Sequence, residues 1–150
     1  NKIHIDKMNL KKSMALMELA PLTRIPGVRF VDLQYGDTDE ERAQFEDETW
    51  AAVLHDDNID QIADLDAFAS QVAAMDLIVS ISNATAHCAG ALGVPALVML
   101  DTTPLPYWLR DRDDNPWYSS VRLFRQKQAG EWKDVVGRVG NAIRAFAATR

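Results

Sequence analysis

Five short apolar segments alternate along this 150-residue chain with segments whose apolar residues recur at helical spacing. The apolar segments cover residues 27–35, 51–57, 77–82, 95–101 and 120–126. Two of them, 77–82 and 95–101, are almost continuously apolar, which is typical of central strands in a parallel sheet covered on both faces. The alternation predicts βαβ units. We therefore expect an α/β fold with a Rossmann-like, doubly wound parallel sheet and helices on both faces.

The intervening segments predict four helices, over residues 38–50, 66–75, 84–92 and 131–149. Asp64 or Asp66 is the expected N-cap of the second of these, since a carboxylate there accepts hydrogen bonds from free N–H groups. A further helix from about Lys12 would be interrupted near Pro21, because proline has no N–H to donate. No linker or repeat divides the chain, so we predict one domain over residues 1–150.

Composition and charge exclude several function classes. The net charge of −6 disfavours nucleic-acid and anionic-membrane partners. The one cysteine, Cys88, excludes an internal disulfide, and we expect it to be a buried structural thiol. No apolar run approaches the ~18–20 residues of a membrane span and no signal-peptide pattern opens the chain, so a cytoplasmic protein is expected. His4, His55 and His87 lack the spacing of zinc ligands, and we expect no metal or other cofactor.

The turn after residues 77–82 gathers polar side chains where a strand becomes a helix. Ser82, Asn83 and Thr85 stand at this turn, and His87 follows in the first turn of the helix. In open α/β sheets ligands bind beyond the carboxyl ends of the strands, where a helix N-terminus presents free N–H groups to phosphate. Ordinary helix capping by Ser or Asn is the alternative interpretation, and spacing alone leaves both open. Neither a G-x-G-x-x-G fingerprint nor a P-loop follows any strand.

Longer segments add a resemblance to a known family. "DLIVSISNATAHCAGALGVPALVML", followed by "PYWLRDRDDNPWYSSVRLFRQ", resembles the C-terminal half of heptosyltransferase-like glycosyltransferases. The nearest likeness is to the bacterial branch in which that half follows tetratricopeptide repeats, a relative of the O-GlcNAc transferases. The strand "GVRFVDLQYGD" is also similar, and the resemblance runs from about Lys11 to the C-terminal helix. Heptosyltransferases usually have Asp-Thr-Gly at the turn. Ser82, Asn83 and Ala84 stand there in this chain, as suits the repeat-associated branch.

The resemblance implies one half of a GT-B fold, in which the active site lies between two Rossmann-like halves. This chain would be the half that binds a nucleotide diphosphate-sugar in an inverting, metal-independent enzyme. The acceptor-binding half, any tetratricopeptide repeats and the first strand of this domain would lie upstream, and the isolated half would not turn over donor. The alternative is a nucleotide-binding or scaffold module of the same fold without transferase activity.

The resemblance also assigns residues to the donor. The candidates for binding it are Lys12, Gln34, Ser82, Asn83, Thr85 and His87, with Leu65 and Trp108 as walls of its pocket. Lys12 would neutralise phosphate charge, or else be a solvated lysine at a helix start. Gln34 would contact ribose, sugar or phosphate, or else be a polar loop residue, and Trp108 could instead cover the core. No catalytic base is assigned, because the position of His87 favours phosphate contact over proton abstraction.

Overall fold

The computed structural model describes residues 14–149 and shows a mixed α/β protein whose paired strands are parallel. The strands form two small sheets, one of β1 (Phe30–Val31) and β2 (Val53–Leu54), the other of β3 (Ile78–Ile81), β4 (Ala96–Leu100) and β5 (Val121–Arg125). Each strand lies inside one of the predicted apolar segments. Within residues 14–149, no strand pairing joins β1 to β3, so the single continuous sheet that we predicted is divided at this point.

The four predicted helices are present, and the N-terminal one differs from the expectation. The α-helices are α2 (Asp39–Thr49), α3 (Leu65–Ala73), α4 (Ala84–Leu92) and α5 (Trp132–Ala147). The segment around Pro21 forms a 3₁₀ helix, η1 (Leu16–Arg24), because proline inside it removes a donor that an α-helix needs. Asp64 is the N-cap of α3 and accepts a hydrogen bond from the Ala67 N–H at 2.9 Å, which confirms one of the two predicted caps.

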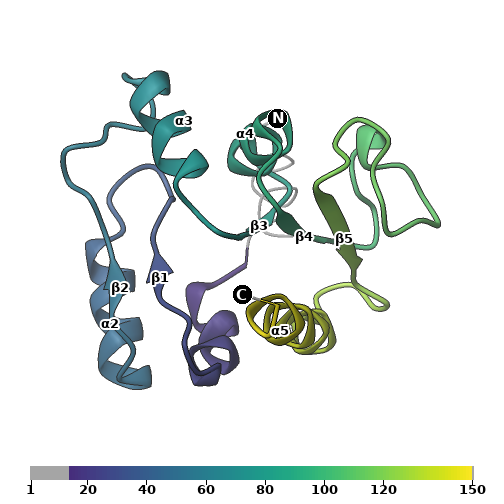
Figure 1. Cartoon of the computed structure of the whole chain (residues 1–150). Coiled ribbons are helices and arrows are strands. Elements are labelled where there is room, and N and C mark those ends of the chain that lie inside the picture. The colour runs from purple at the N-terminus through teal and green to yellow at the C-terminus, as the bar shows by residue number, and fades with distance from the viewer. Residues whose placement is uncertain (1–13, 150) are drawn as a thin grey trace, which may run out of the picture.

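Helices cover both faces of the three-stranded sheet, as predicted. Figure 1 shows α3 and α4 on one side of β3, β4 and β5, and η1 and α5 on the other. All five residues of β4 are buried, and two apolar clusters meet this strand from opposite sides. One cluster includes Phe68 and Val72 of α3, and the other includes Val135 and Val139 of α5. This explains why residues 95–101 show no polar alternation.

The order of strands across the molecule is β2, β1, β3, β4, β5 (Figure 1). The division between the sheets therefore falls between β1 and β3. None of the helices within the described residues is long and apolar enough to cross a membrane.

Candidate functional site

A cavity of about 850 Å³ lies between the two sheets. Its apolar lining comes from β1, β3, η1 and α5, and includes Leu19, Leu22, Phe30, Val31, Ile78, Val79 and Ile143. Polar side chains from the segments after β1 and β3 also line it, namely Asp32, Gln34, Thr38, Asn83 and Thr85, and its charged lining further includes Arg29, Glu41, Arg42 and Asp76. An apolar space with a few convergent polar groups is the usual form of a small-molecule site, and about 300–1,000 Å³ is the usual volume.

Asn83 lies at the boundary between β3 and α4 and is the N-cap of α4. Its Oδ1 accepts hydrogen bonds from the Ala86 N–H at 3.1 Å and from the buried Ser80 hydroxyl at 2.9 Å. The capping interpretation is therefore confirmed for this oxygen. Capping does not exclude ligand binding, because the Asn83 Nδ2 group makes no hydrogen bond to the other residues described.

Thr85 and His87 lie on different sides of α4. Two residues correspond to about 200° around an α-helix, so the side chains diverge. Thr85 lines the cavity between the sheets, and His87 contacts the loop that follows β4. The structure therefore brings Gln34, Asn83 and Thr85 together at one cavity and holds His87 apart from it. Lys12 lies outside the described residues.

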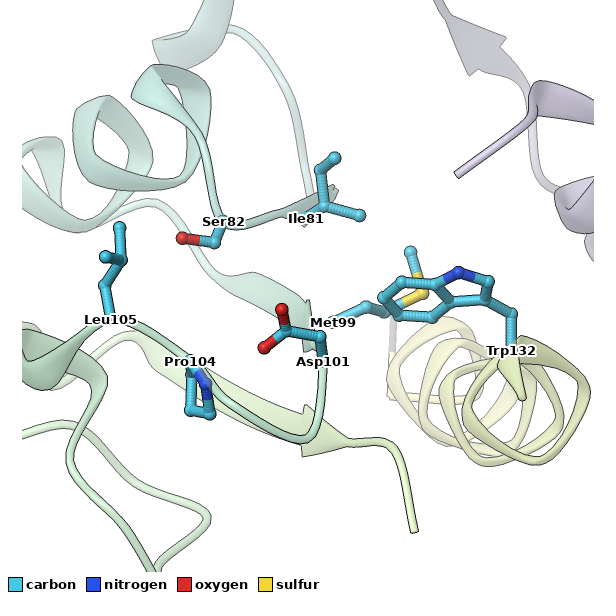
Figure 2. Close-up of a pocket in the computed structure, with 7 residues that line it drawn as sticks. All are labelled: Ile81, Ser82, Met99, Asp101, Pro104, Leu105 and Trp132. Atoms are coloured by element: carbon cyan, nitrogen blue, oxygen red, sulfur yellow. The ribbon is translucent and has the colours of Figure 1, made fainter. Parts of the chain in front are cut away.

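Ser82 also lies apart from the large cavity. Its Oγ accepts a hydrogen bond from the Trp108 Nε1–H at 2.8 Å. It borders a second space of about 10 Å³ near the ends of β3 and β4, together with Asp101 and Leu105 (Figure 2). That volume holds about one water molecule, which is too small for a phosphate.

Aromatic side chains surround the His87 ring. The ring stacks on Trp108 with centroids 4.9 Å apart and meets the edge of Tyr107 at 4.9 Å. Its Nδ1 lies 3.1 Å from the Tyr118 hydroxyl. Burial lowers the pKa of His87, so its imidazole is neutral at neutral pH and can offer an N–H but no positive charge to a ligand.

We expect the NMR titration midpoint of His87 to lie below the ordinary histidine pKa of about 6.5. Because the pKa is lower in the folded than in the unfolded protein, the folded protein binds fewer protons between the two values. The stability that the neutral ring contributes is therefore present above about pH 6.5 and is lost as the pH falls through the folded pKa. A midpoint at or above 6.5 would contradict this burial effect.

The cavity also contains a carboxylate that the sequence analysis did not single out. Asp32 accepts hydrogen bonds from the Thr38 hydroxyl at 2.6 Å and from the Gln34 N–H at 2.8 Å. Its Oδ2 lies 3.4 Å from Nδ1 of His55, whose Nε2 lies 3.5 Å from Asp57. These contacts fix the loop that carries Gln34. Asp32 directly follows β1, but it lies inside the predicted strand segment 27–35, and no spacing linked it to His55.

The two predicted wall residues lie elsewhere. Leu65 begins α3 with 68% of its surface exposed, and it lines neither of the two cavities described above. Trp108 is fully buried, which agrees with the alternative that it covers the core. Cys88 packs against the same core but is only partly buried, so the expected buried thiol is confirmed in part, and this burial raises the pKa of the thiol. Among the described residues no group of three or more His, Cys, Asp or Glu side chains could hold a metal ion.

The fold and this cavity define a parallel α/β protein with a largely apolar cavity, bordered by polar side chains, where its two sheets meet. The chain is 43% identical over 130 residues to Protein FlbA of Caulobacter vibrioides, a match that covers 86% of this chain. It spans 21% of the length of that relative, about a fifth. No family model matches the chain, and no solved structure matches it either.

Proposed function

We propose that this domain binds a nucleotide diphosphate-sugar and forms the donor half of an inverting, metal-independent glycosyltransferase. One observation carries the proposal. The cavity between β1 and β3 is lined by Gln34 and by Asn83 and Thr85, and the last two stand at the N-terminal end of α4. A helix N-terminus carries a partial positive charge and N–H donors, which favour a phosphate there.

The polar side chains directly after β1 and β3 suggest how the donor would lie. The diphosphate would lie on the β3 side, where Asn83 and Thr85 offer donors near the start of α4. It would avoid the β1 side, because the Asp32 carboxylate repels phosphate. Ribose or sugar hydroxyls suit that side, since a carboxylate accepts their hydrogen bonds and Gln34 both donates and accepts.

We further propose that the two sheets belong to one Rossmann-like, doubly wound sheet of the GT-B type. The strand order across Figure 1 and the helices on both faces support this arrangement. The apolar side chains that line the cavity lie between β1 and β3. Among the described residues, no strand lies between β1 and β3 and pairs with both of them. A further parallel strand at this position would cover these apolar side chains and leave the polar side chains after β1 and β3 free to bind the donor.

The relative supports a place for this domain in a longer polypeptide. Protein FlbA is matched over a fifth of its length, so it contains much chain beyond the matched region. In our proposal the acceptor-binding half, tetratricopeptide repeats and the catalytic base belong to such a longer chain.

Calorimetric titration of the chain with UDP, ADP and GDP tests the proposal. We expect saturable binding of one diphosphate, weakened about 10-fold to 100-fold by Thr85→Val, which removes one hydroxyl contact to a charged group while preserving shape. Thr49→Val is the matched control, because Thr49 lies at the far end of α2 and does not line the cavity. Binding of none of the three at millimolar concentration, or equal loss in both variants, would contradict the proposal.

A second candidate function is a binding or scaffold module of this fold without transferase activity. It is favoured by the position of His87, which was expected to contact phosphate but packs against aromatic rings and does not line the large cavity. The two functions differ in a transfer assay on the longer polypeptide. Donor binding without hydrolysis or transfer would support the module, and product formation would support the transferase.

A further inference from the structure

The neutral His87 ring has two possible tautomers, and one neighbour selects between them. The Tyr118 hydroxyl lies 3.1 Å from Nδ1 of His87. A phenol is a good hydrogen-bond donor, and an unprotonated imidazole nitrogen is a good acceptor. The favoured arrangement therefore has the Tyr118 O–H donating to Nδ1, which leaves the ring proton on Nε2.

The fold holds Tyr118 firmly at this place. Its ring lies so close to α4 that a Cβ on Gly90 would be 2.4 Å from the ring atom Cγ. Its backbone N–H donates to Oδ1 of Asn115 at 3.2 Å, and Asn115 is buried at the start of the turn. The hydroxyl therefore reaches His87 from a ring that is packed on the same helix, one turn further along.

Stacking on Trp108 fixes the plane of the His87 ring. Trp108 stacks on it with an interplanar angle of 20°, and the Trp108 Nε1–H is bonded to Ser82. The His87 Nε2 atom takes no hydrogen bond from the described residues and is not among the buried atoms that lack a partner. This nitrogen is therefore the end of the ring that reaches the surface.

We propose that Tyr118 is a positioning residue that keeps the His87 proton on Nε2, where it can be donated to an oxygen of an anionic ligand that extends from the cavity across the first turn of α4, from the side of Thr85 to the side of His87. The identity of that ligand rests on the proposed function, and the tautomer does not. Tyr107 contacts the same ring through its edge alone, so it provides a control for packing without the hydrogen bond.

Histidine ¹⁵N NMR of the ligand-free chain tests the assignment, with the signal of His87 identified by its loss in His87→Gln. In the unsubstituted protein we expect almost all of the neutral ring to carry its proton on Nε2. Tyr118→Phe is expected to give a mixture of both tautomers, and Tyr107→Phe is expected to leave the ratio unchanged. A proton on Nδ1 in the unsubstituted protein, or the same ratio in Tyr118→Phe, would overturn the proposal.

Diphosphate affinity provides a separate measurement. Tyr118→Phe is expected to weaken the binding of the best diphosphate about threefold to tenfold, as for one neutral hydrogen bond, and Tyr107→Phe is expected to have no comparable effect. If the unsubstituted chain binds no diphosphate, the proposed function fails while the tautomer ratio still decides the role of Tyr118. Circular dichroism of both variants checks that they fold equally.

Discussion

Replacing Trp108 with alanine is expected to lower the free energy of unfolding by about 3–5 kcal/mol. The indole is fully buried in the core cluster that packs between α3, α4 and the three-stranded sheet. The substitution removes this apolar surface, leaves a cavity and deprives the Ser82 hydroxyl of its donor. Urea denaturation followed by far-ultraviolet circular dichroism measures the change.

Trp117→Ala is the matched control for this prediction. Trp117 lies in the same long loop, but 67% of its surface is exposed. Its loss should change the free energy of unfolding by no more than about 0.5 kcal/mol, as is usual for surface substitutions. Equal effects of the two substitutions would mean that Trp108 does not hold the loop to the core.

Gly90→Ala is expected to destabilise the protein even though alanine is the better helix former. The gain in helix propensity is about 1 kcal/mol. The new Cβ would lie 2.4 Å from Cγ of the Tyr118 ring, and this part of the ring cannot move without shifting the whole residue. Overpacking of this kind costs about 1–3 kcal/mol. We therefore expect a net loss of stability and a change in the His87 tautomer ratio, because Tyr118 is pushed from its place.

Gly137→Ala provides the comparison, since a Cβ at this position of α5 would meet no atom within 4 Å. It is expected to raise the stability by up to about 1 kcal/mol through helix propensity and a smaller unfolded-state entropy. Denaturant titrations of the two variants measure their free energies of unfolding relative to the unsubstituted protein. An increase in stability for Gly90→Ala would show that Tyr118 does not pack on the helix as described.

The secondary structure was predictable from the sequence because local patterns determine it. The buried strand β4 is apolar on both faces, and Asp64 caps α3 through its own neighbours. Pro21 indicated an irregular helix, and the structure shows which kind. The division between β1 and β3 was not predictable, because both segments have the composition of strands and the sequence does not show which strands pair.

The positions of the candidate site residues were predictable in part, for similar reasons. Asn83 and Thr85 lie where β3 becomes α4, as expected from their place after an apolar segment, whereas the cavity that they line was not predicted. The divergence of Thr85 and His87 follows from helix geometry and was available from the sequence. The hydrogen-bond partner of His87 could not be predicted from the sequence, because Tyr118 lies 31 positions further along the chain, at the end of an irregular loop.

Residue-resolved NMR during titration with UDP, ADP and GDP tests most directly whether the start of α4 and the adjoining cavity bind a diphosphate. We expect one of the three diphosphates to shift the backbone signals of Asn83 and Thr85 and the side-chain amide of Gln34 in a saturable manner. Signals of α2 near Thr49, at the far end from the cavity, should remain in place. Saturable shifts confined to another surface, or no shifts at millimolar diphosphate, would contradict this expectation.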